Sequence, residues 1–130
     1  MSTFMPYVLV GIGGFIGANA RLVVAQLVGA AFDTRFPLGT FLINISGSFL
    51  LGALGVAVAE RVTADSEALR LALGVGFLGA FTTFSTFEFE THALIEDGSF
   101  LIAATNMVAS LLVGLVAVRA GIVVAKSLLH

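Results

Sequence analysis

The stretch GFLGAFTTFSTFEFET, residues 76–91, decides the fold because it places helix-weakening residues inside an apolar segment. Gly76 and Gly79, with Gly74 just before them, each weaken a helix by about 1 kcal/mol relative to alanine. The hydroxyl groups that follow can bond backbone carbonyls and bend a helix. They belong to Thr82, Thr83, Ser85 and Thr86. The pattern predicts a helix that is broken near residues 79–83.

The chain around this stretch has the composition of an integral membrane protein. Of its 130 residues, 58% are hydrophobic and 11% are charged, and the mean hydropathy is +1.09. Soluble domains carry roughly 25% charged residues, so a surface with this composition could not be solvated. Four stretches reach the length of about 20 apolar residues that a bilayer-spanning helix needs. They are residues 4–29, 38–59, 69–95 and 99–127.

We therefore expect an all-α membrane protein made of one four-helix domain over residues 1–130, with its third helix broken. Residues 1–20 contain no Lys or Arg, so the apolar start is expected to be an uncleaved helix rather than a signal peptide. A net charge of −2 without a basic run argues against a nucleic-acid partner. The absence of cysteine excludes disulfides and thiolate metal sites. Without a catalytic triad, a metal cluster or a phosphate-binding glycine loop, we expect no enzyme.

Small and polar residues form a stripe along several of the expected helices. Gly13 and Gly17 have the spacing that lets a second helix approach closely, and Arg21 continues the same face. An arginine at this depth either has a role in the interior or extends toward the membrane surface. Two other helices carry polar stripes at the same spacing. These are Thr40, Asn44 and Ser48 in the second helix, and Asn106, Ser110 and Gly114 in the fourth.

Two interpretations of the Asn44 stripe stay open. A buried amide can bridge two helices, or it can join neighbouring hydroxyls in a ladder of hydrogen-bond donors along a path. The helix break also predicts a cation site. Backbone carbonyls that lose their helical hydrogen bonds at membrane depth are good ligands for a small cation such as Na⁺.

The positive charges do not decide which way the chain inserts. One end of the bundle is expected to hold three of them, and the other end Arg35. The three are Arg61, Arg70 and Lys126. This small excess favours cytoplasmic termini only weakly, so insertion in both orientations stays open.

Three motifs together resemble the Fluc (CrcB) fluoride channel family. They are GGFIGANAR at 13–21, GTFLINISGSFLLG at 39–52 and GFLGAFTTFSTFEFE at 76–90. The resemblance implies a passive, fluoride-selective channel in the bacterial inner membrane, which lets fluoride leave the cytoplasm and lowers its toxicity. It also implies an antiparallel, dual-topology homodimer with two pores and a central Na⁺ ion that is not transported.

The resemblance assigns roles to individual positions. Phe84 and Phe87 match the pore phenylalanines, and Asn44 matches the pore asparagine. The backbone carbonyls of Gly79 and Thr82 match the Na⁺ ligands. Further residues on the expected anion path are Thr40, Thr83, Glu90, Ser110 and Arg21.

Two positions depart from the family pattern. Asn106 stands where members often carry Tyr or His, and Glu88 stands where a Ser is common. The hydroxyl track beyond Ser110 falls on Gly114 and Val118. The departures leave the track beyond Ser110, and Glu88, without an assigned role.

Two other functions were weighed. A small proton-coupled multidrug exporter also has four helices, but it needs an acidic residue embedded in its first helix, and residues 1–32 contain no Asp or Glu. Glu88 and Glu90 could still serve such an exporter from the third helix. A non-transporting assembly subunit would explain the glycine faces and leave the Asn44 stripe without a role.

Overall fold

The computed structural model describes residues 1–60 and 64–130, and all the regular structure in these residues is helical. Within them, four helices are long and apolar enough to cross a membrane, which confirms the predicted all-α class with four spans. The spans are α1 (Met5–Ala31), α2 (Leu38–Glu60), a composite third span (Asp65–Glu96) and α6 (Phe100–Leu129). Arg61, one of the positive charges counted above, lies outside the described residues.

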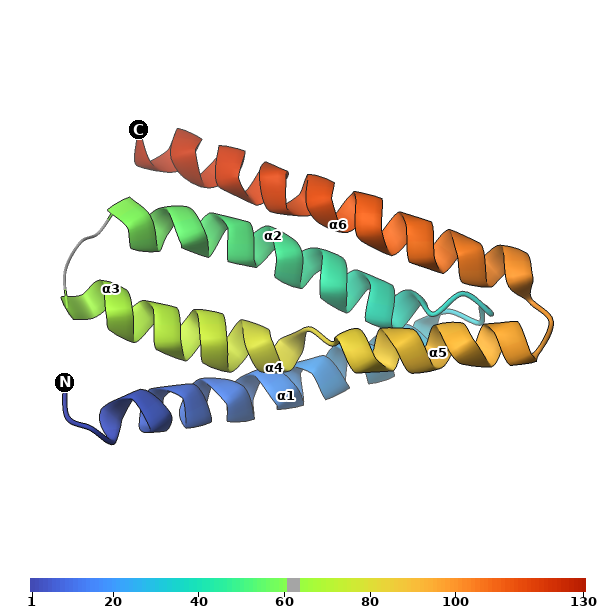
Figure 1. Cartoon of the computed structure of the whole chain (residues 1–130), viewed down its shortest axis with the longest axis horizontal. Coiled ribbons are helices and arrows are strands. Elements are labelled where there is room, and N and C mark those ends of the chain that lie inside the picture. Colours follow the sequence, from blue (N-terminus) through green and yellow to red (C-terminus); the bar gives the residue numbers. More distant parts are fainter. Residues whose placement is uncertain (61–63) are drawn as a thin grey trace.

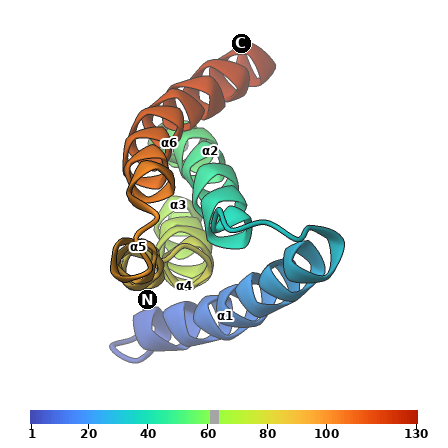
Figure 2. The same cartoon turned by 90° about the vertical axis from the view of Figure 1, so that its right-hand side faces the viewer.

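The spans run side by side, with both chain termini at one end of the molecule (Figure 1). Figure 2 shows that α1 and α6 occupy opposite edges, with α2 and the third span between them. The most extensive pairings are α2 with α6, and α1 with the first half of the third span. The single chain is therefore an open arrangement rather than a closed bundle.

The third span consists of four segments. Its first half begins with α3 (Ala64–Leu69) and continues as a π-helix, η1 (Arg70–Leu78). This half ends before the break in a single turn, α4 (Gly79–Phe81). The helix α5 (Phe84–Glu96) follows the break. Only Thr82 and Thr83 are extended, with φ/ψ of −80°/156° and −150°/119°.

The break thus lies inside the predicted range, at Thr82 and Thr83 rather than at the glycines before them. The glycine-rich part of the span keeps helical hydrogen bonds in a widened form, and the Gly79 N–H donates to the Gly74 carbonyl five residues earlier. A backbone group inside a membrane needs a partner wherever the helix opens. The chain opens at Thr82 and Thr83, where Asn44 supplies such a partner to Thr83.

The predicted close approach of another helix to Gly13 and Gly17 is seen in the contact between α1 and η1. A Cβ atom on Gly13 would lie 2.0 Å from the carbonyl oxygen of Ala72. One on Gly17 would lie 2.2 Å from the carbonyl oxygen of Phe77. Neither position can carry a side chain without separating the two backbones.

Glycines also allow close backbone contact between α2 and α6. A Cβ atom on Gly52 would lie 2.3 Å from the Val118 carbonyl oxygen, and one on Gly121 would lie 2.0 Å from the Phe49 carbonyl oxygen. Lipid tails are as apolar as the helices, so close packing of this kind is a main source of helix association in a membrane.

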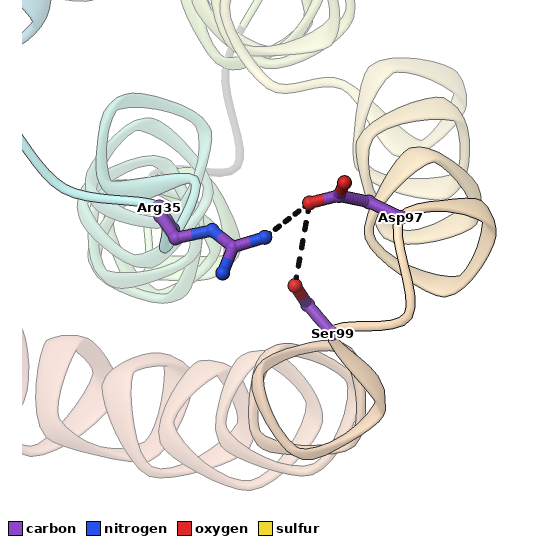
Figure 3. Close-up of polar contacts among 3 residues, drawn as sticks. All are labelled: Arg35, Asp97 and Ser99. Carbon is purple, nitrogen blue, oxygen red and sulfur yellow. Dashed lines mark hydrogen bonds and ion pairs between the residues drawn. The ribbon is translucent and has the colours of Figure 1, made fainter.

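Polar contacts join the connections at the end opposite the termini. Arg35, between α1 and α2, forms an ion pair with Asp97, between α5 and α6 (Figure 3). Ser99 donates a hydrogen bond of 3.4 Å to the same carboxylate. Gly98, with φ of +80°, makes the tight turn expected there. Exposed ion pairs add little stability, so this contact mainly holds the two connections together.

Candidate functional site

A groove of about 540 Å³ lies between α2, the third span and α6, on both sides of the helix break. We call it the central groove. It contains five of the residues that the sequence assigns to the anion path and both residues assigned to Na⁺. The five are Asn44, Thr83, Phe84, Phe87 and Ser110, and the two are Gly79 and Thr82.

Asn44 pairs with the backbone at the break through both ends of its amide. Its Nδ2 donates to the Thr83 carbonyl oxygen at 3.0 Å, and its Oδ1 accepts from the Thr83 N–H at 2.8 Å. Gly47, one turn further along α2, makes room for this docking, because a Cβ there would lie 2.2 Å from Cγ2 of Thr82. Asn44 therefore bridges two helices and also borders the central groove.

The same hydrogen bonds release two backbone carbonyls. In a continuous α-helix the Thr83 N–H would donate to the Gly79 carbonyl, and the Thr86 N–H would donate to the Thr82 carbonyl. Here the Thr83 N–H donates to Asn44, and the Thr86 N–H donates to Oγ1 of Thr83 at 3.2 Å. The carbonyls of Gly79 and Thr82 thus lose their helical donors.

The two phenylalanines lie at the start of α5, directly after the break. The ring centroids of Phe84 and Phe87 are 6.0 Å apart, and the ring planes are tilted by 46°. Phe84 is 75% exposed in the single chain, whereas Phe87 is half-buried. Both rings border the central groove.

The three other residues that the sequence assigns to the anion path, Thr40, Glu90 and Arg21, do not border the central groove. Thr40 donates a hydrogen bond to Oε1 of Glu90, which joins α2 to the middle of α5. Arg21 is half-buried on α1 and makes no hydrogen bond or ion pair with residues 1–60 or 64–130. The structure thus brings Thr40 and Glu90 together, and Arg21 shares no hydrogen bond or ion pair with them.

The sequence also matches a known protein family. The sequence profile described as "CrcB-like protein, Camphor Resistance (CrcB)" matches residues 8–122. The chain belongs to the CrcB family. The resemblance found in the three sequence motifs is thereby confirmed.

Curated relatives cover nearly the whole chain. A protein of Geobacter sulfurreducens named "Fluoride-specific ion channel FluC" is 44% identical over 119 residues, which are 92% of this chain and 95% of that protein. A protein of the same name from Solibacter usitatus is 39% identical over 122 residues, 94% of this chain and 99% of that protein. Together with the four spans, these relatives identify a multi-pass membrane protein.

Asn106 is buried between α5 and α6. Its Nδ2 donates to Oγ1 of Thr91 at 2.9 Å, and its Oδ1 accepts from the Ser110 hydroxyl at 3.1 Å. The sequence places Thr91 on the same helix face as Phe84 and Phe87 but assigns it no role. Its position four residues after Phe87 was the available signal, because a threonine in a helix often bonds the carbonyl one turn back.

Glu88, to which the sequence assigned no role, is exposed on α5 of the single chain. It makes no hydrogen bond or ion pair with the residues that the structure describes.

Substituting Asn44 tests its pairing with the break. Asn44→Leu keeps most of the side-chain volume but leaves the Thr83 N–H and carbonyl without these partners, so we expect a loss of about 2 kcal/mol in stability. The measurement is thermal unfolding of the purified protein in detergent. Asn19→Leu is the matched control, because the Asn19 amide is exposed and bonds only the Phe15 carbonyl of its own helix. Equal melting of Asn44→Leu and the unsubstituted protein would contradict the assignment.

Proposed function

We propose that this chain is a fluoride-selective, passive ion channel of the bacterial inner membrane, which lets fluoride leave the cytoplasm and lowers its toxicity. The observation that carries the proposal is the pair of phenylalanine rings beside a backbone break, in a chain 44% identical to a protein named as a fluoride-specific channel. The names of the relatives describe ion transport, which supports a channel rather than an enzyme.

The lining of the central groove suits a small, strongly hydrated anion. A conducting pore must replace the ion's water with contacts that are individually weak, so that the ion can leave again. The edge of an aromatic ring is the positive end of its quadrupole and offers a contact of this kind. Phe84 and Phe87 supply such edges, and no charged side chain among residues 1–60 and 64–130 borders the groove.

Two polar donors remain available beside the rings. An asparagine amide has two N–H bonds, and Asn44 uses one of them on the Thr83 carbonyl. Ser48 also borders the groove, and its hydroxyl has no hydrogen-bond partner within residues 1–60 and 64–130. By contrast, the Thr83 and Ser110 hydroxyls donate to Thr86 and Asn106. Asn44 and Ser48 are therefore the stronger candidates for direct contact with the anion.

Proton-coupled drug export receives less support. Glu90, one of the two acidic residues that could have served it from the third helix, accepts a hydrogen bond from Thr40. Exchange of protons for substrate would also need a pH gradient, whereas a channel passes its ion without one. Fluoride efflux measured with and without a pH gradient separates the two functions.

Transport by purified protein tests the channel proposal. Liposomes that contain the protein are expected to release fluoride and to retain chloride. Phe84→Ile or Phe87→Ile removes a ring edge and should slow fluoride release by at least about tenfold, equivalent to about 1.4 kcal/mol of lost contact. Phe89→Ile is the matched control, because Phe89 lies on the same helix and is 76% exposed but does not border the groove. Release at the unsubstituted rate from both Phe84 and Phe87 variants would refute the proposed path.

We further propose that two copies assemble as an antiparallel homodimer with two pores. The openness of the single chain supports this assembly, because a second copy would cover Phe84 and the exposed part of α5 around Glu88. Closed twofold pairs are the commonest form of homo-oligomer. An antiparallel pair also supplies the inverted symmetry that many transporters build within one chain.

Changing the charge balance tests the dual topology. Asp33→Lys with Thr34→Lys loads one end of the chain with positive charge, and Ser127→Lys with His130→Lys loads the other. Each pair should fix one orientation and suppress fluoride release, because positive loops stay in the cytoplasm. Expressing both variants together should restore release. Full activity of either variant alone in cells would speak against the antiparallel dimer.

We also propose a structural Na⁺ ion at the centre of this dimer, held by the main-chain oxygens of Gly79 and Thr82. The residues fit the ion, because both carbonyls have lost their helical donors and both border the groove. When bound, the ion would add positive potential beside the anion path without a titratable group. The two carbonyls would orient toward it and hold the two copies together.

Removing sodium tests this site without a transport measurement. A ligand that binds only the folded protein stabilises it by about 2.7 kcal/mol at a hundredfold excess over its dissociation constant. We therefore expect the purified protein to melt at a lower temperature when Na⁺ is replaced by a large organic cation at equal ionic strength. Identical melting in the two salts would count against the Na⁺ site.

A further inference from the structure

The helix that carries both rings has little apolar packing of its own. Of the thirteen residues of α5, the buried ones are Thr91 and Leu94. The break at Thr82 and Thr83 also separates α5 from the rest of the third span. Hydrogen bonds to neighbouring helices must therefore contribute strongly to the position of α5.

Three such hydrogen-bonded contacts hold α5 from two sides. On the α2 side, Asn44 binds the residue just before α5, and Thr40 binds Glu90. On the α6 side, Asn106 binds Thr91. The α6 contact is the most enclosed of the three, because Asn106 is 1% exposed and Thr91 is 5% exposed.

The contact between α5 and α6 is part of a chain of hydrogen bonds in which every donor has an acceptor, and the chain ends at the backbone carbonyl of Phe87. The Thr91 hydroxyl donates its hydrogen to the Phe87 carbonyl at 2.7 Å, so it accepts the bond from Nδ2 of Asn106. The Ser110 hydroxyl in turn donates to Oδ1 of Asn106. Within the described residues, no buried side-chain nitrogen or oxygen lacks a partner. The chain of bonds thus connects α6 to the peptide unit of Phe87.

Asn106 itself does not border the central groove. Its neighbours Met107, Ser110 and Leu111 line the groove, whereas Asn106 and Thr91 are enclosed between α5 and α6. A side chain in that place cannot touch an ion in the groove. It can act on the ion only through the orientation of α5.

We propose that Asn106 and Thr91 form a positioning pair that sets the rotation of α5 and thereby directs the Phe87 ring edge into the groove. The inference rests on the proposed fluoride channel. The Asn106 amide reaches the Thr91 hydroxyl directly, at 2.9 Å.

Two substitutions of Thr91 separate hydrogen bonding from packing. Thr91→Val keeps the shape but removes the hydroxyl, whereas Thr91→Ser keeps the hydroxyl and removes a methyl group. Thr91→Val should slow fluoride release from liposomes by roughly tenfold, the scale of one lost buried hydrogen bond, and should lower the ratio of fluoride to chloride release. Thr91→Ser should retain both values. A role in packing alone predicts the reverse order.

Asn106→Leu should match Thr91→Val, and the double variant should be no slower than either, because both changes break the same contact. Thr105→Val is the matched control, since the Thr105 hydroxyl makes the same bond to the carbonyl four residues back, Leu101, without a partner on α5. Release from Thr91→Val at the unsubstituted rate would overturn the positioning pair. So would additive losses in the double variant.

The rate of amide hydrogen exchange in α5 tests the positioning pair without a transport measurement. It therefore separates this inference from the proposed channel function. Thr91→Val and Asn106→Leu should speed exchange in residues 84–96, whereas Thr91→Ser and Thr105→Val should not. If the unsubstituted protein releases no fluoride, the channel proposal fails and the exchange pattern alone decides the positioning pair. Unchanged exchange in Thr91→Val would then overturn it.

Discussion

The pairing of the Asn44 amide with the Thr83 backbone is the interaction on which the rest of the structure depends. A chain that leaves helical geometry at membrane depth exposes N–H and carbonyl groups that lipid cannot satisfy. Asn44 satisfies one of each with a single side chain. This allows the break, starts α5 directly behind it and so places Phe84 and Phe87 beside the carbonyls of Gly79 and Thr82. The rings and the proposed cation site are therefore two consequences of one contact.

The polar side chains near the break mostly bind the protein rather than face the central groove. The Thr83 hydroxyl caps α5, Thr40 binds Glu90, and the Thr91, Asn106 and Ser110 side chains bind one another or the backbone. What remains for an anion is a small set of weak contacts, made of ring edges, one amide N–H and one hydroxyl. In the proposed channel, none of the charged side chains that the structure describes borders the central groove to trap the ion, which agrees with conduction through weak sites in series.

Glycine determines how closely the helices that carry these groups approach. Backbone meets backbone where α1 crosses η1 and where α2 crosses α6, and Gly47 lets the broken segment dock on α2. In the chain so packed, α1 and α6 lie at opposite edges (Figure 2). The exposure of Phe84 and of the α5 surface around Glu88 is the reason a second copy enters the proposed function.

The sequence by itself determined the membrane class, the four spans, the glycine contact of α1 and the family, because composition, length and short-range spacing are local properties. It also indicated a break near residues 79–83 and seven of the residues that border the groove, five for the anion path and two for Na⁺. Only the tertiary structure decided that the break falls at Thr82 and Thr83, that the glycines before it form a π-helix, and that Asn106 contacts Thr91 instead of the groove. The physical reason is that a backbone opens where a partner is present, and the partner of Thr83 comes from another helix, 39 residues away along the chain.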